Sequence, residues 1–355
     1  MKKHILVLAL ICGVFLGSCD EGKKKEATDE NTPPSRGIPE RKTKLDLGIV
    51  HENLAFDADP GLSYSLYLPR TMKGKQDYPV LYCIDPKGMG HIPLYLYRNL
   101  ADSFEVILVG CNTSKNGMTF PESEKALNLL VAEIQRKYPV EQNIHLLGFS
   151  GGAKVAFHYA DINPNVNKLL YSGAVYPLKR QTNISLLGFV GKRDMNFADL
   201  VSFEVSMGKA PFTHQLIQWD GKHEFPSEEV MRDGFYFLKN DSVQNYHKKI
   251  PHVAQEDVMR EQMIKRKFYQ SFGTKDLGWW KTEIAELNKF AKNEVMFERV
   301  LGFIGLSCYS FTQQAIQAGD VAKADYMVQI YLMATPDNED AKRFAEQIRE
   351  MKQAQ

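Results

Sequence analysis

The sequence lacks several features that would assign it to well-known functional classes. Its N-terminal apolar run, residues 5–16, is shorter than the roughly 20 residues that cross a bilayer as a helix. Lys plus Arg number 44 and Asp plus Glu 43, so there is no surplus of positive charge to attract a phosphate backbone. No C-x-x-C or H-E-x-x-H spacing of metal ligands occurs. We therefore expect no transmembrane helix, no nucleic-acid partner and no metal.

The N-terminus resembles a bacterial lipoprotein signal. Lys2 and Lys3 precede the short apolar run, which ends in Leu16-Gly17-Ser18-Cys19. Small residues directly before a cysteine resemble the lipobox, which implies a signal peptide over residues 1–18 and a lipid on the thiol of Cys19. The alternative is an ordinary cleaved signal beside an incidental cysteine. The resemblance implies a lipid-anchored protein of the cell envelope, at the outer membrane or the periplasmic face, with a membrane as partner.

Cysteine is scarce, with five in 355 residues. Cys12 lies in the predicted signal and Cys19 is the predicted lipid site, which leaves Cys83, Cys111 and Cys308. An odd number gives no disulfide framework. Cys83 and Cys111 fall near the ends of two predicted strands, and one alternative is a bridge between them. We favour two buried thiols, because free cysteine behaves as a small apolar residue.

The rest of the chain divides into a tether and two folded regions. Residues 20–44 are charged and almost free of apolar side chains, so 19–45 is interpreted as a disordered tether. Over 46–243 short apolar runs alternate with helical patterns, which is typical of a mostly parallel sheet with helices on both faces. The predicted strands are 47–56, 62–68, 79–84, 106–111, 144–149, 168–175, 184–190 and 213–219, and the predicted helices are 92–101, 121–137, 151–161, 197–207 and 226–239.

Residues 250–355 form a separate, all-helical module in this interpretation. Amphipathic periodicity predicts helices over 252–270, 277–291, 294–317, 320–334 and 337–353. Gly319, Ala324, Val328 and Pro336 have spacings that resemble part of a tetratricopeptide repeat. The alternatives are a repeat-like module that binds a protein partner and plain packing against the first domain.

The motif that carries most chemistry is Gly148-Phe149-Ser150-Gly151-Gly152. It fits G-x-S-x-G and falls between a predicted strand and a predicted helix. A nucleophilic serine has to sit on such a sharp turn so that its hydroxyl projects from the sheet, and flanking glycines remove side chains that would clash. The helix that follows places partial positive charge where an oxyanion would form.

Two further residues complete a catalytic set in the expected order. A serine needs a base to take its proton, and the base needs a carboxylate that fixes its tautomer. Asp194 follows the strand 184–190 and His223 follows the strand 213–219, so both lie at the carboxyl-end rim with Ser150. Asp199 and Asp220 are rival acids, but the first lies inside a predicted helix and the second is only three residues from His223.

These motifs give the chain a family resemblance. With Tyr64 to Pro69 and Tyr78 to Leu81, the stretch 47–240 resembles an α/β-hydrolase and, within that superfamily, esterases of the poly(3-hydroxybutyrate) depolymerase and feruloyl-esterase type. The resemblance implies an α/β-hydrolase sheet followed by the all-helical module. It also implies acyl transfer from an ester, bound to a small molecule or a polysaccharide, by Ser150, Asp194 and His223 without a cofactor.

One loop departs from the pattern of the family. Many relatives end the third strand with His-Gly, whose loop supplies an oxyanion donor, whereas this chain has Asp85-Pro86-Lys87-Gly88. Pro86 has no N–H to donate. We expect the oxyanion donors to be the N–H of Gly151 together with that of Lys87 or Gly88.

The leading functional hypothesis is a serine esterase of the cell envelope. The first alternative is an envelope serine peptidase, although the short segment 176–183 leaves little room for a substrate-selecting lid. The second is a non-catalytic surface lipoprotein that retains the hydrolase fold and binds a partner through residues 250–355.

Overall fold

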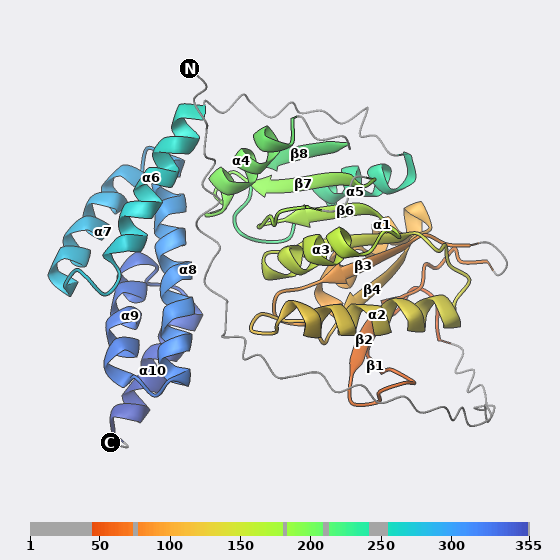
Figure 1. Cartoon of the computed structure of the whole chain (residues 1–355), viewed down its shortest axis with the longest axis horizontal. Coiled ribbons are helices and arrows are strands. Elements are labelled where there is room, and N and C mark those ends of the chain that lie inside the picture. The colour runs from red at the N-terminus through yellow and green to blue at the C-terminus, as the bar shows by residue number, and fades with distance from the viewer. Residues whose placement is uncertain (1–44, 74–76, 180–182, 209–212, 241–254, 354–355) are drawn as a thin grey trace, which may run out of the picture. The chain divides into compact units, whose positions relative to one another are not determined.

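The computed structural model describes residues 45–73, 77–179, 183–208, 213–240 and 255–353 (Figure 1). Asp46–Gln355 group into one compact unit that contains both a sheet and a helical region. The predicted signal peptide 1–18, the lipid site Cys19 and the tether up to residue 44 lie outside the described residues. No helix among those residues is both long enough and apolar enough to cross a membrane.

Eight strands form one sheet in the order β1-β2-β4-β3-β5-β6-β7-β8. The strand β2 pairs antiparallel with both β1 and β4, and the other pairs from β4 to β8 are parallel. The strands are β1 (Val50–Ala55), β2 (Ser63–Tyr67), β3 (Val80–Ile84), β4 (Ile107–Cys111), β5 (Ile144–Phe149), β6 (Val166–Ser172), β7 (Ser185–Gly191) and β8 (His214–Trp219).

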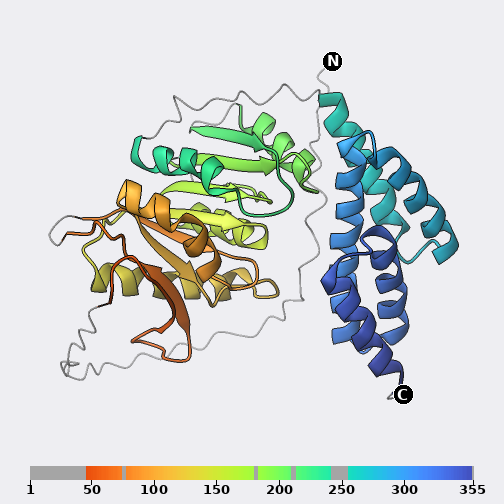
Figure 2. The same cartoon turned by 180° about the vertical axis from the view of Figure 1, so that it is seen from behind.

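Helices cover both faces of this sheet. The helices α1 (His91–Phe104) and α5 (Glu228–Asn240) pack against each other on the face nearer the viewer in Figure 2. The helices α2 (Phe120–Lys137) and α3 (Gly151–Ile162) lie on the opposite face, nearer the viewer in Figure 1. Ring contact between Phe157 of α3 and Phe203 places α4 (Phe197–Met207) with them.

Burial on both faces explains the composition of the central strands. Every residue of β3 and β4 is buried, so these strands are continuous apolar runs rather than alternating ones. Leu81, Leu108 and Leu147 of neighbouring strands share one core with Tyr97 of α1 and Phe235 of α5. Cys83 belongs to this core, and Cys83 and Cys111 are both buried, free thiols.

The end of β6 differs from the prediction. The sequence predicts a strand over 168–175, but the strand ends at Ser172. Gly173 has a φ of +72°, a left-handed conformation that turns the chain out of the sheet. Residues 173–179 and 183–184, the described parts of the short connection to β7, contain no helix.

The helical region follows the sheet. It consists of α6 (Gln255–Ser271), α7 (Leu277–Ala291), α8 (Val295–Gln317), α9 (Val321–Ala334) and α10 (Glu339–Gln353). Trp280, Val300, Ile304 and Ile330 are fully buried in its core, and Cys308 is a buried free thiol within it. The predicted fold class, a mostly parallel sheet with helices on both faces followed by an all-helical region, is confirmed. The likeness to a tetratricopeptide repeat stays a prediction.

Candidate active site

Ser150 occupies a strained turn between β5 and α3. Its φ is +52° and its ψ is −120°, a backbone conformation that non-glycine residues rarely adopt. Its N–H donates to the carbonyl of Ser172 at 2.8 Å, and its carbonyl accepts from the N–H of Ala153 at 3.0 Å. The first bond ties the turn to β6 and the second begins α3. The strain is therefore held by the surrounding structure, as is common at functional sites.

The glycines around Ser150 are required by close approach of the backbone. A Cβ on Gly148 would lie 2.5 Å from the Cα of Ala153, and a Cβ on Gly152 would lie 2.1 Å from the carbonyl oxygen of Ile84. Both contacts are with backbone, which cannot move aside without shifting β3 or α3. The G-x-S-x-G pattern thus reflects tight strand-to-helix packing in this chain.

The loops that carry Asp194 and His223 are bonded to each other. The N–H of Lys192 donates to the carbonyl of Trp219 at 2.9 Å, and the N–H of Arg193 donates to the carbonyl of Gly221 at 2.9 Å. These bonds extend the pairing of β7 with β8 past the ends of the strands. They hold the two loops side by side at the carboxyl-end rim, beside the turn of Ser150.

The structure brings Ser150, His223 and Asp194 into one hydrogen-bonded chain. Oδ1 of Asp194 lies 2.9 Å from Nδ1 of His223, and Nε2 of His223 lies 2.9 Å from Oγ of Ser150. Because an ionised carboxylate only accepts, Nδ1 carries the proton and Nε2 is left to accept from the serine hydroxyl. The side chain of Asp194 is 1% exposed and that of His223 is 17% exposed. This arrangement suits a general base that is open to a substrate on one side.

Two residues that no sequence motif marks, Asn196 and Gly173, support the hydrogen bonds between Asp194, His223 and Ser150. Asn196 donates its backbone N–H to Oδ1 of Asp194 at 2.8 Å and its side-chain amide to the carbonyl of Gly173 at 2.6 Å. A Cβ on Gly173 would lie 2.9 Å from Cε1 of His223. The Phe149 ring packs against the imidazole, with centroids 4.9 Å apart. No sequence motif marks Gly173 or Asn196. Their roles arise because the chain after β7 meets the chain after β6, where the Asn196 amide bonds the carbonyl of Gly173.

The rival acids lie elsewhere. Asp199 lies within α4, where its carboxylate accepts from Nε2 of Gln262 at 3.5 Å, and burial raises its pKa. Asp220 is exposed. Because Nδ1 of His223 is already bonded to Asp194, neither rival replaces Asp194 as the partner of the imidazole.

The N–H groups of the predicted oxyanion donors Lys87 and Gly88 are bonded within their own loop. The N–H of Lys87 donates to Oδ1 of Asp85 at 2.7 Å, and that of Gly88 donates to the carbonyl of Asp85 at 3.2 Å. Oδ1 of Asp85 also accepts from the N–H of Met89 at 3.1 Å. Both N–H groups are therefore occupied in this structure, because Asp85 turns back onto the amides of its own loop, and the role of Lys87 and Gly88 as oxyanion donors stays a prediction.

Gly151 and Asn116 carry further N–H groups beside the turn of Ser150. The N–H of Gly151 is one of the donors at the start of α3 that have no acceptor within the helix. A Cβ on Gly151 would lie 1.8 Å from Oδ1 and 3.3 Å from Nδ2 of Asn116, so this exposed amide lies directly against the turn. The N–H of Asn116 donates to the carbonyl of Pro86 at 2.7 Å, which fixes its loop beside the Asp85 loop.

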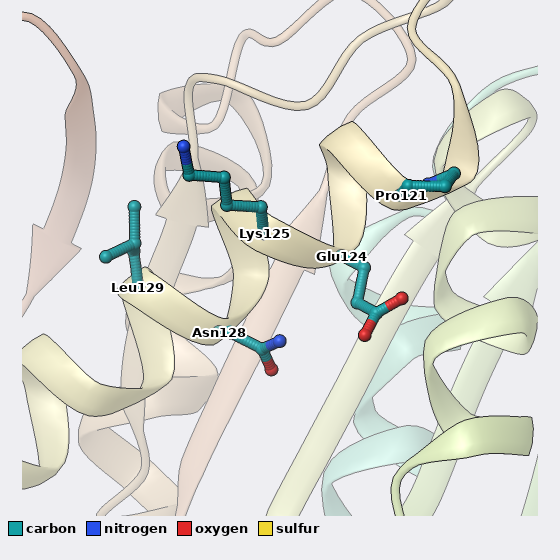
Figure 3. A pocket seen from close by; sticks show the side chains of 5 residues that line it. All are labelled: Pro121, Glu124, Lys125, Asn128 and Leu129. Atoms are coloured by element: carbon teal, nitrogen blue, oxygen red, sulfur yellow. The ribbon is translucent and has the colours of Figure 1, made fainter. Parts of the chain in front are cut away.

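A hollow on α2 holds none of these residues. It has a volume of about 440 Å³ and is lined by side chains from successive turns of one helix, which Figure 3 shows as Pro121, Glu124, Lys125, Asn128 and Leu129. In the part of the chain that the structure describes, no group of three or more His, Cys, Asp or Glu side chains is placed to hold a metal ion.

Comparison with known proteins gives distant structural likenesses only. No family model and no curated protein matches the sequence. S-formylglutathione hydrolase from Staphylococcus aureus superposes with a TM-score of 0.46 at 11% identity over 54% of this chain and 96% of its own. An esterase from Pyrobaculum calidifontis superposes with a TM-score of 0.45 at 12% identity, over 56% of this chain and 87% of its own. Esterase B from Lactobacillus rhamnosis superposes with a TM-score of 0.46 at 13% identity, over 55% of this chain and 89% of its own.

Proposed function

We propose that this chain is a serine hydrolase that cleaves ester bonds through Ser150, His223 and Asp194. The observation that carries the proposal is the pair of 2.9 Å contacts that link the three side chains, with the serine on a strained turn between strand and helix. A hydroxyl is a weak nucleophile at neutral pH, and this arrangement supplies the base that it needs.

The mechanism is acyl transfer in two steps. In the first, Oγ of Ser150 attacks the ester carbonyl while Nε2 of His223 takes its proton, and the imidazolium then protonates the departing alcohol. In the second, water attacks the acyl-enzyme with the same base, and the carboxylic acid leaves as Ser150 regains its proton. Asp194 keeps the imidazole in the required tautomer and stabilises its charged form. Ser150 and His223 carry every proton transfer in this scheme, so it requires no cofactor.

We further propose that the oxyanion is held by the N–H of Gly151 and the side-chain amide of Asn116. This replaces the expected donors on the Asp85 loop, whose amides are occupied. Support comes from the position of Asn116 against Gly151. One oxyanion donor typically contributes on the order of 10²–10³ in rate.

The substrate class and the location are proposed from the sequence. The resemblance to small esterases favours acyl esters, whether on small molecules or on polysaccharides. The peptidase and the non-catalytic binding lipoprotein are the alternatives, and the second would use residues 250–355 to hold a protein partner. A lipid on Cys19 would anchor the chain in the cell envelope, and incorporation of labelled fatty acid that stops in Cys19→Ser would support this.

The test is hydrolysis of short and medium p-nitrophenyl esters by the chain without residues 1–19. We expect turnover that Ser150→Ala abolishes and that Ser206→Ala, at an exposed serine of α4, leaves unchanged. Asn116→Ala should lower kcat by on the order of 10², because one oxyanion donor is lost, without a matching rise in KM. Turnover that survives in Ser150→Ala would contradict the proposal. Absence of turnover and of reaction with a serine-directed fluorophosphonate would favour the binding protein.

A further inference from the structure

Three charged side chains of the helical region form a buried cluster. Glu261 and Lys265, one turn apart on α6, are each 1% exposed, and the side chain of Arg299 on α8 is 13% exposed. Oε1 of Glu261 lies 2.6 Å from Nζ of Lys265. Oε2 of Glu261 accepts from Nε and Nη2 of Arg299 at 2.9 and 2.6 Å. The cluster carries two positive charges and one negative charge.

The remaining donors of this cluster reach the loop of Asp194. Nη1 of Arg299 donates to the carbonyl of Lys192 at 2.8 Å, and Nζ of Lys265 donates to the carbonyl of Met195. Lys192 and Met195 lie on either side of Asp194 in the chain. The main chain that carries the acid is thus held at two points by cations from α6 and α8.

Packing around the cluster fixes the same loop. The guanidinium of Arg299 lies 4.4 Å from the ring centroid of Phe197, the first residue of α4. A Cβ on Gly302 of α8 would lie 3.3 Å from the Cβ of Met195, so the helix backbone lies close to the loop. Arg193 also pairs at 3.7 Å with Glu298 of α8, although both side chains are largely exposed.

A cluster of this kind is poorly explained as a source of stability alone. Removing three charged groups from water is costly, and apolar side chains of similar volume often serve stability as well or better. Charged groups add hydrogen bonds of defined geometry, which apolar packing does not supply. The planar fork of Arg299 fixes Glu261 and the carbonyl of Lys192 in one geometry, which a point charge or an apolar side chain cannot do.

We propose that Glu261, Lys265 and Arg299 are positioning residues for Asp194, and that the helical region is thereby part of the catalytic machinery. The proposal rests on the proposed function of Ser150, His223 and Asp194. The cluster holds the acid loop so that Oδ1 of Asp194 meets Nδ1 of His223.

The test uses Arg299→Lys in the full chain. Lysine keeps the charge beside Glu261 but cannot bond Glu261 and the carbonyl of Lys192 with the same planar fork. The matched control is Arg260→Lys, because Arg260 also pairs with a glutamate and lies 5.6 Å from an aromatic ring centroid, at the surface of α6. A second variant, Lys265→Met, leaves the Glu261–Arg299 pair intact and removes the bond to Met195.

The readouts are kcat and KM for a p-nitrophenyl ester and the rate constant of labelling by a fluorophosphonate. We expect Arg299→Lys and Lys265→Met each to lower kcat and the labelling rate about tenfold with KM within about twofold, since small misplacements of catalytic groups cost rate. In an Asp194→Asn background the same changes should have no further effect on labelling, because they act through the acid.

Other results would refute either the positioning role or the proposed hydrolase function. Wild-type rates in both cluster variants, or equal losses with and without Asp194→Asn, would refute the positioning role and leave the serine hydrolase in place. A loss in Arg260→Lys as large as that in Arg299→Lys would refute it too. A wild-type chain that neither hydrolyses the ester nor reacts with the fluorophosphonate would refute the proposed function, and the positioning role with it.

Discussion

At the scale of single residues, Gly173 tests how closely His223 is held. Its φ of +72° strains any side chain, and a Cβ there would press on the imidazole at 2.9 Å. Gly319 has almost the same φ, +71°, but nothing lies within 4 Å of its Cβ position. Gly319→Ala should lower the free energy of unfolding by about 1 kcal/mol, and Gly173→Ala should lower it by more, because its Cβ also presses on the rings of His223 and Phe149.

Only the change at Gly173 should impair catalysis. We expect kcat for a p-nitrophenyl ester to fall by at least about tenfold in Gly173→Ala, because the ring of His223 is displaced, and to stay at the wild-type value in Gly319→Ala. Urea unfolding and steady-state kinetics on the two variants give both numbers. Equal kcat in the two variants would contradict the position assigned to the imidazole.

Asp199 gives a prediction about pH. Burial raises the pKa of this carboxyl, while the charge of Lys265 and the hydrogen bond from Gln262 oppose the shift. The folded state therefore holds the proton more tightly than the unfolded state, so stability falls as pH rises from about 4 through the folded-state pKa. Asp199→Asn cannot ionise and escapes this loss.

The difference in Tm between Asp199→Asn and the wild type should thus grow in favour of the variant between pH 4 and 7. Thermal unfolding followed by circular dichroism at several pH values measures it. A difference that stays constant or shrinks over this range would show that the carboxylate is better stabilised in the folded chain than burial allows.

At the scale of elements, α2 illustrates how local sequence sets a helix end. The side chain of Thr119 accepts from the N–H of Glu122, whose carboxylate accepts in turn from the N–H of Thr119 at 2.7 Å. Thr119→Ala should lower the free energy of unfolding by about 1 kcal/mol. Thr282→Ala, on an exposed position inside α7, should leave it unchanged or raise it by a few tenths, because alanine is the better helix former. Urea unfolding of both variants measures these changes. Equal changes in the free energy of unfolding would contradict the capping role of Thr119.

Most elements could be predicted from the sequence because their signals are local. Buried strands such as β3 and β4 are unbroken apolar runs, and Pro121 marks the start of α2. The order of serine, acid and histidine followed from strand ends that share one rim. The error in β6 arose because residues 173–175 remain apolar in sequence while Gly173 already turns the chain.

The site was predictable only where one motif or strand end defines a residue. Whether the N–H of Lys87 is free depends on the rotamer of Asp85, and whether that of Gly88 is free depends on the turn of the loop; sequence reveals neither. Glu261 and Lys265 have the i, i+4 spacing typical of an ion pair on a solvated helix face. Their burial depends on the contact of α6 with α4 and with the loop of Asp194, which is distant in sequence.

At the scale of the whole molecule, the sheet and the helical region belong to one compact unit, Asp46–Gln355. The sequence indicates two regions from their change in periodicity. It does not reveal that α6 and α8 reach carbonyls of the loop after β7. We therefore propose one reactive serine, Ser150, whose reactivity depends on residues from both the sheet and the helical region.

The most direct measurement is peptide mapping by mass spectrometry after reaction of the chain with a fluorophosphonate. We predict one adduct per chain, on Oγ of Ser150, because this hydroxyl lies 2.9 Å from an imidazole that is itself bonded to a buried carboxylate. The adduct should be absent in Ser150→Ala and form far more slowly in His223→Ala. Unmodified Ser150, or an adduct at another serine at the wild-type rate, would contradict the account.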